Sequence, residues 1–164
     1  MKTSALYLRT IIFGIIDSLV STVGLLAGMS VAGAAPATLA LTGIVYAFVE
    51  AFSMAVGNFL SEQSAEEYQS KTDVPNRPPL IAGAIMFISF VLAAFIPLIP
   101  YLFLTAWVAL TVSIIASITA LFIVGTLSAR ISHLPMFWRG VRMALLGGAA
   151  IIMGVVIGSL VPAG

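Results

Sequence analysis

The sequence predicts an all-α polytopic membrane protein with five transmembrane helices. Of its 164 residues, 61% are hydrophobic and only 8% are charged, and the mean hydropathy is +1.17. Such a chain has too little polar side-chain surface to cover a water-soluble globule of its size. A helix needs about 20 mostly apolar residues to cross the hydrocarbon core, and the chain holds five such runs, separated by breaks rich in proline, glycine or charge.

The five predicted spans are residues 7–31, 37–60, 80–99, 102–127 and 136–161. They take up most of the chain, so we expect residues 1–164 to form a single transmembrane domain. The first span is longer than the apolar core of a secretory signal peptide, typically about 7 to 15 residues, and it contains Asp17, so we expect it to be retained. Pro97 and Pro100 are expected to end the third span, because proline cannot donate the backbone hydrogen bond of a helix.

The basic residues predict the orientation of the chain in the membrane. They are Lys2, Arg9, Lys71, Arg77, Arg130, Arg139 and Arg142. With five spans, all seven fall on one side of the bilayer and none on the other. Because cytoplasmic loops carry the excess of Lys and Arg, we expect a cytoplasmic N-terminus and a C-terminus outside. We expect a multi-pass protein of a prokaryotic plasma membrane, and an organelle membrane is the alternative.

Two carboxylates, Asp17 and Glu50, lie inside the first and second predicted spans. At about 1.5 Å per residue, Asp17 is about 12 Å from Arg9, and Glu50 is about 18 Å from Glu62. Both therefore lie at similar depths on antiparallel helices and could meet. A charge near the centre of a membrane helix costs about 2.5 to 3.5 kcal/mol and usually serves an ion, a proton or a partner. The basic residues cluster at the span ends, so we expect a proton or a bound cation to neutralise the pair.

Glu50, Met54 and Asn58 follow one another at intervals of four residues, so a carboxylate, a thioether and an amide share one stripe of the second helix. A thioether favours late first-row metals over calcium or magnesium, and oxygen with sulfur suits ions such as Fe²⁺ or Mn²⁺. Two alternatives stay open. Met54 alone is often a packing residue, and buried carboxylates can hydrogen-bond to a neighbouring helix during assembly.

Residues 61–79, "SEQSAEEYQSKTDVPNRPP", are predicted to form a short acidic cytoplasmic loop whose first part can continue the second helix. In that case Glu62 and Glu66 share a face, with Glu67 beside them. This face continues the stripe of Glu50, Met54 and Asn58, so it could collect cations at the mouth of a path. A solvated helix end is the alternative.

Two pairs of glycines, Gly24 with Gly28 and Gly154 with Gly158, form GxxxG patterns. Such patterns allow close contact between membrane helices, either as packing within the chain or as a dimer seam. His133, the sole histidine, is expected to lie in a loop at the membrane interface.

Several segments together resemble the vacuolar iron transporter family. They are "FGIIDSLVSTVGLLAG", "EAFSMAVGNFLSEQSAEEY", "ALFIVGTLSARIS" and "RGVRMALLGGAAIIMGVVIGSLV". The resemblance implies a five-helix subunit, a homodimer with the ion path between subunits, and export of ferrous or related divalent ions from the cytosol in exchange for protons. By position, it implies that Asp17 is the family's first-helix aspartate and that Met54 is the methionine of its "SM" motif. Glu66 and Glu67 fall where the family's cytoplasmic glutamates begin.

The chain also departs from the family. Asn58 stands where many members have a glutamate, and the resemblance supplies no carboxylate at Glu50, whose role rests on physical argument alone. Characterised members insert a cytoplasmic helical metal-binding domain between the second and third helices, and residues 61–79 leave no room for it.

The sequence therefore predicts a transporter and not an enzyme, with Fe²⁺ or Mn²⁺ exported in exchange for protons. The candidate metal-binding residues are Asp17, Glu50, Met54, Asn58, Glu62, Glu66 and Glu67. We expect no tightly bound cofactor and no nucleic-acid partner; the expected partners are the lipid bilayer, divalent metal ions, protons and a second copy of the chain. The alternative is a non-transporting membrane scaffold whose buried carboxylates specify helix association. An intramembrane enzyme is disfavoured, because no cysteine or embedded histidine supplies a nucleophile and base.

Overall fold

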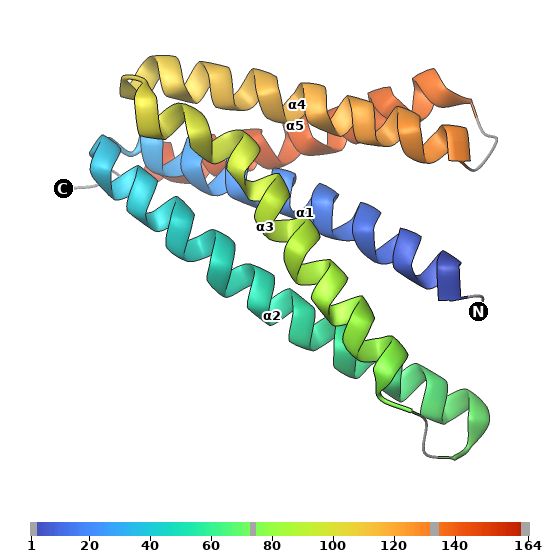
Figure 1. Cartoon of the computed structure of the whole chain (residues 1–164). Helices are drawn as coiled ribbons and strands as arrows, with labels where there is room; N and C mark the ends of the chain where they lie inside the picture. Colours follow the sequence, from blue (N-terminus) through green and yellow to red (C-terminus); the bar gives the residue numbers. More distant parts are fainter. Residues whose placement is uncertain (1–2, 73–74, 132–134, 162–164) are drawn as a thin grey trace.

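The computed structural model describes residues 3–72, 75–131 and 135–161, which form five long α-helices and parts of their connections (Figure 1). The helices are α1 (Thr3–Val31), α2 (Pro36–Ser70), α3 (Arg77–Phe103), α4 (Ala106–Ile131) and α5 (Met136–Leu160). Within the described residues, all five are long and apolar enough to cross a membrane. The prediction of an all-α chain with five membrane-spanning helices is confirmed to that extent.

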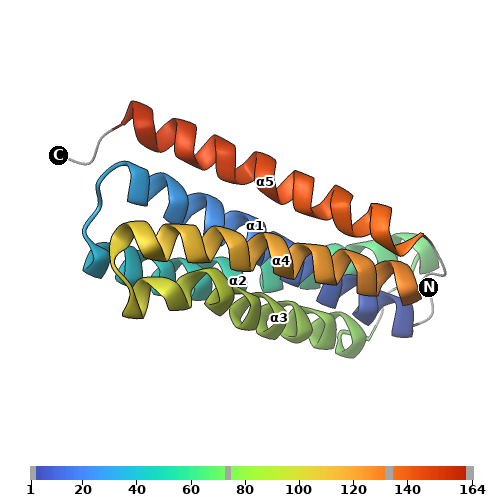
Figure 2. The ribbon, with the colours of Figure 1, turned by 90° about the horizontal axis from the view of Figure 1, so that it is seen from above.

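Helix α1 lies at the centre of the bundle. It packs against each of the other four helices, whereas α2 and α5 share no packed interface in the part of the chain that the structure describes. Figure 2 shows α5 along one edge of the bundle and α3 along the other, with α1 passing between them. Leu19, Val23 and Leu26 of α1 are fully buried in this arrangement. Because it contacts every other helix, α1 holds the bundle together.

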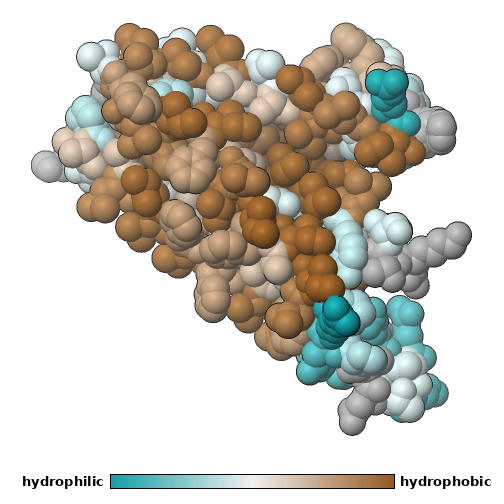
Figure 3. Space-filling model, viewed as in Figure 1, coloured by the Kyte–Doolittle hydropathy of each residue, from teal (hydrophilic) through white to brown (hydrophobic). Residues whose placement is uncertain are grey.

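The outer surface of the bundle is apolar along most of its length and polar at one end (Figure 3). Large apolar side chains such as Phe52, Leu92 and Leu145 are exposed on it, as expected for helices that face lipid. We call the polar end of the bundle the basic end. Helices α1, α3 and α5 begin there, and α2 and α4 end there. The described basic residues, Arg9, Lys71, Arg77, Arg130, Arg139 and Arg142, all lie in or near it.

Local sequence explains where α2 begins and ends. Gly33 adopts a φ of 90° in the turn after α1, a left-handed conformation that glycine reaches without steric cost. Pro36 then begins α2, because its fixed φ suits a first helical turn. At the other end Lys71 has a φ of 54°, and its backbone N–H donates to the Glu67 carbonyl oxygen at 2.8 Å.

The expectation that Pro97 and Pro100 end the third span is wrong, because α3 continues through both to Phe103. An unpaired backbone group in the bilayer costs several kcal/mol, so a helix that keeps its remaining hydrogen bonds is favoured over a broken one. Both prolines lack the backbone N–H of an interior helical residue, and their own carbonyl oxygens accept hydrogen bonds. Leu104 N–H donates to Pro100 O at 2.9 Å, and Ser113 Oγ of α4 donates to Pro97 O at 2.8 Å.

The acidic segment begins as helix and not as loop, since α2 runs on to Ser70. Glutamate, glutamine and alanine favour helix here, and Gln63 Nε2 donates to Glu67 Oε1 one turn along at 2.9 Å. The helical continuation allowed for the first part of residues 61–79 is therefore present as far as Ser70, and a shorter connection leads to Arg77. His133 and Lys2 lie outside the described residues.

Candidate functional site

The carboxylates of Asp17 in α1 and Glu50 in α2 lie close enough to interact electrostatically. Both are partly buried, and neither accepts a hydrogen bond nor forms an ion pair among the described residues. Two negative charges repel one another strongly in a medium of low dielectric constant. The pair therefore needs a proton or a cation for neutralisation.

Two hydroxyl groups lie beside this carboxylate pair. Ser21 Oγ donates to the Asp17 carbonyl oxygen at 2.6 Å, and the Tyr46 hydroxyl lies next to Ser21 and within electrostatic range of both carboxylates. Sequence reasoning missed Tyr46. It precedes Glu50 by four residues, so the spacing that links Glu50 to Met54 was the signal that could have found it.

A cleft of about 540 Å³ between α1, α2 and α3 leads from the basic end toward the pair. We call it the cleft; it is lined by Arg9, Thr10, Phe13, Ser53, Met54, Gly57, Asn58, Ser61 and Met86. Phe13 and Met54 lie one helical turn from Asp17 and Glu50, respectively, so the carboxylates stand just beyond its inner end. Sequence reasoning placed Met54 and Asn58 on one stripe, and both line this cleft.

Two polar atoms in the cleft lack partners within the described residues. They are Thr10 Oγ1 and Asn58 Nδ2, each buried and without a hydrogen bond. Buried polar groups are almost always satisfied by protein or by water. The unpaired hydroxyl and amide therefore make the cleft suitable for water or a hydrated ion.

A smaller pocket of about 240 Å³ adjoins the cleft at the basic end. We call it the outer pocket; it is lined by Leu6, Arg9, Ser61, Glu62, Ala65, Glu66, Gln69 and Pro78. Arg9 and Glu62 form an ion pair across α1 and α2, with side-chain exposures of 58% and 8%. No sequence pattern relates residues so far apart, and this pair was not anticipated.

The candidate residues thus fall into three groups along one line. Asp17 and Glu50 lie within electrostatic range of each other, Met54 and Asn58 line the cleft, and Glu62 and Glu66 line the outer pocket. Glu67 lines neither space and instead accepts the hydrogen bond from Gln63. Over residues 3–72, 75–131 and 135–161, no three His, Cys, Asp or Glu side chains form a group that could hold a metal ion. In the described part of a single chain, the candidate ligands therefore follow one another in space and do not surround a single ion.

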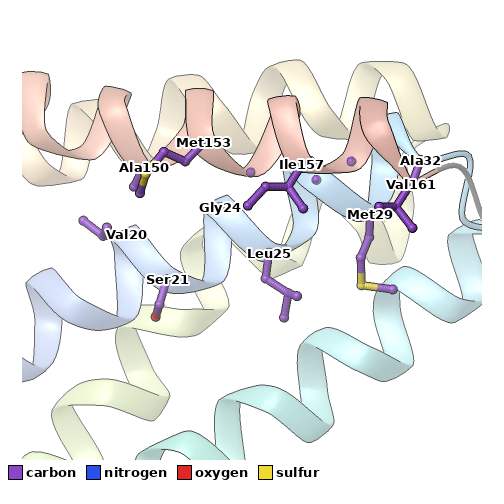
Figure 4. Close-up of a pocket in the computed structure, with 13 residues that line it drawn as sticks. Val20, Ser21, Gly24, Leu25, Met29, Ala32, Ala150, Met153, Ile157 and Val161 are labelled. Carbon is purple, nitrogen blue, oxygen red and sulfur yellow. The ribbon is translucent and has the colours of Figure 1, made fainter.

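The glycine patterns bring α1 and α5 into backbone contact at the other end of α1. A Cβ atom on Gly154 would fall 2.1 Å from the Gly24 carbonyl oxygen, so only glycine fits. The packing alternative for these patterns is confirmed. A groove of about 550 Å³ follows this crossing (Figure 4). Met153 and Ile157 of α5 and Leu25 and Met29 of α1 line it.

One face of α1 stays uncovered in the single chain. Ser21 lines the groove beside α5 and also neighbours Tyr46 of α2. Since α2 and α5 do not pack together in the described part of the chain, the strip of α1 between them is open. This strip passes directly beside the Asp17 and Glu50 pair.

The chain is similar to known proteins along most of its length. The chain is 29% identical to vacuolar iron transporter homologs 1 and 3 of Arabidopsis thaliana over 157 residues, which covers 88% of this chain and 77% of each relative. It is 27% identical to vacuolar iron transporter homolog 2 of the same plant over 154 residues, or 87% of this chain and 77% of that protein. The model of the VIT family matches residues 8–77 and 72–159. The chain therefore belongs to the VIT family.

Proposed function

We propose that this chain carries divalent transition-metal ions, Fe²⁺ or Mn²⁺, out of the cytosol in exchange for protons. The observation that carries the proposal is the Asp17 and Glu50 pair, which lies inside the membrane-spanning bundle without a cationic partner among the described residues. Ionisable groups at such depth usually mark an ion or proton path. The three Arabidopsis relatives named as vacuolar iron transporter homologs support a metal ion as the cargo.

The order of the donor groups supports a route. With the basic end in the cytoplasm, an ion meets Glu66 and Glu62 first, then Asn58 and Met54, and finally the pair of Asp17 and Glu50. The Met54 thioether favours late first-row metals over magnesium and calcium. When the metal leaves, protons neutralise the carboxylates, and this alternation between metal-bound and protonated states is what exchange requires.

We also propose a homodimer. The uncovered strip of α1 exposes the neighbourhood of two carboxylates, and a charge that faces lipid costs free energy. A second copy, related by a two-fold axis, would cover this strip with the same strip of its own α1. Donors from both copies would then surround one ion, which accounts for the absence of a complete metal cage in the described part of a single chain.

The experiment is metal uptake by the purified chain in proteoliposomes. Mn²⁺ entry and internal pH are followed together under an imposed proton gradient, for the wild type, Asp17→Asn and Glu50→Gln. Thr111→Val is the matched control, because Thr111 is exposed on α4 and donates only to Trp107 of its own helix. Loss of coupled uptake in the two carboxylate variants alone supports the proposal. No uptake by the wild type under any gradient would favour the membrane scaffold.

The membrane itself remains a prediction. The relatives are named for the vacuole, whereas the basic residues of this chain predict only which end faces the cytoplasm. A prokaryotic plasma membrane stays our proposal, and fractionation of native membranes with detection of the chain would test it.

A further inference from the structure

Arg9 stands between the outer pocket and the cleft. The residues that line these two spaces have only Arg9 and Ser61 in common in the described part of the chain. Arg9 is also the sole basic side chain among those linings. An ion that moves from Glu66 in the outer pocket to Met54 in the cleft would therefore pass beside Arg9 and Ser61.

The two members of the Arg9 and Glu62 ion pair differ sharply in exposure. The Arg9 side chain is 58% exposed, whereas that of Glu62 is only 8% exposed. Arg9 can therefore swing into water at little cost in solvation, but Glu62 stays buried in the wall of the outer pocket. A buried carboxylate that loses its partner is strongly destabilised, so the departure of Arg9 requires that another cation or a proton neutralise Glu62.

We propose that Arg9 is a tethered counter-ion that closes the passage between the outer pocket and the cleft, and that a divalent metal ion opens it by replacing the guanidinium at Glu62. The proposal rests on the proposed function for the nature of the ion. It makes Arg9 a residue that determines specificity for ionic charge, distinct from the groups that carry the ion farther in.

The physical basis is competition between a free and a tethered cation. Arg9 is attached to the bundle, so its effective concentration at Glu62 is high, and a free monovalent ion brings no larger charge with which to displace it. A divalent ion gains twice the Coulomb energy at Glu62, and Glu66 in the same pocket adds to the attraction. Potassium and sodium are therefore excluded while divalent ions enter.

The first test is calorimetric titration of the purified full-length chain with Mn²⁺, with and without excess K⁺. Arg9→Gln should tighten Mn²⁺ binding roughly threefold to tenfold and make it sensitive to K⁺. Arg139→Gln, which removes an exposed arginine of α5 at the same end, should bind as the wild type does. In an E62Q background the effect of Arg9→Gln should vanish, as a double-mutant cycle requires for a direct pair. Unchanged or weaker binding in Arg9→Gln, or an effect that persists with E62Q, would overturn the proposal.

The second test uses the wild type and does not depend on the folding of a variant. An arginine-selective dicarbonyl reagent is applied with and without Mn²⁺, and modification is read at each arginine by peptide mass spectrometry. Mn²⁺ should speed modification at Arg9, because the guanidinium is released, and leave Arg139 unchanged. A rate at Arg9 that stays constant or falls would contradict release.

Mn²⁺ uptake by the wild type in liposomes separates this proposal from the proposed function. If Mn²⁺ releases Arg9 but the wild type carries no metal, the transport function fails and the counter-ion role stands. If the wild type carries Mn²⁺ but neither Arg9→Gln nor the reactivity of Arg9 responds as expected, the role of Arg9 fails and transport stands.

Discussion

Gly158 of α5 lies so close to Gly28 of α1 that a Cβ atom on Gly158 would fall 2.0 Å from the Gly28 carbonyl oxygen. One turn earlier, Gly154 approaches Gly24 in the same way. The backbones of α1 and α5 are therefore in direct contact at these glycines, and a larger residue would force the two helices apart.

Gly158→Ala should therefore destabilise the bundle by about 1 to 3 kcal/mol, the usual cost of forcing a methyl group into a packed interface. Thermal unfolding in detergent measures the change. The control is Gly148→Ala on the same helix, where an added Cβ meets no atom within 4 Å and the change should be neutral or slightly stabilising. Equal effects at the two positions would show that the α1 and α5 crossing is looser than described.

Asp17→Asn and Glu50→Gln should each lower the apparent affinity for transported Mn²⁺ by at least about tenfold, since each removes a charged oxygen donor from the ion's path. Uptake at a series of Mn²⁺ concentrations measures this effect. Thermal unfolding of the same samples should show little loss of stability, because neither carboxylate has a hydrogen-bond partner among the described residues to lose. Full affinity in both variants would place the path elsewhere.

Wild-type affinity for Mn²⁺ should fall as the pH on the cytoplasmic side falls. Protons and metal compete for the same two carboxylates, and only the ionised groups bind the metal. The sign is fixed by this competition: affinity is highest where both groups are ionised and declines as they take up protons. Mn²⁺ titrations at several pH values would check it, with Glu50→Gln expected to show a shallower dependence. A flat wild-type profile is incompatible with proton exchange at this pair.

Met54→Leu should keep the fold and change the selectivity. Leucine conserves the volume, so the stability cost should stay below about 1.5 kcal/mol. It removes the sulfur that lines the cleft, so competition by Co²⁺ against Mn²⁺ uptake should weaken relative to competition by Mg²⁺. If the ratio of the two inhibition constants does not change, Met54 is a packing residue.

Tyr46→Phe should slow metal uptake severalfold, because it removes the hydroxyl that lies beside Ser21 and both carboxylates. The ring and its packing are kept, so any effect reports on the hydroxyl alone. Tyr68→Phe is the matched control, since Tyr68 is 85% exposed. Initial rates of Mn²⁺ uptake compare the two variants, and equal rates would remove Tyr46 from the site.

The spans could be predicted because the bilayer imposes one length and one composition on every helix that crosses it. The ends of these helices were harder to predict. Pro97 and Pro100 normally stop a helix in water, but unpaired backbone groups cost more in the bilayer, and α3 continues through both prolines. Residues 61–70 were assigned to a loop whose first part could continue the second helix, and their residue types favour that helix.

The relative positions of several candidate residues were predictable where they follow helical periodicity and depth. These two quantities placed Asp17 near Glu50 and set Met54 and Asn58 on one stripe. The pairing of Arg9 with Glu62 depends instead on how α1 and α2 are rotated and offset against each other, which the packing of the whole bundle decides. For the same reason, sequence alone left it open whether the glycines join helices of one chain or of two.

The crossing of α1 with α5 also bears on how the chain is assembled during synthesis. The ribosome makes the helix with Gly24 and Gly28 first and the helix with Gly154 and Gly158 last, so this close backbone contact joins residues that lie far apart along the chain. Contacts between residues far apart in the chain form late, because the entropy cost of closing a long segment precedes any stabilisation by the contact. A nascent chain released before residue 136 would leave α1 without its glycine partner, and such truncated products should be recognised and degraded.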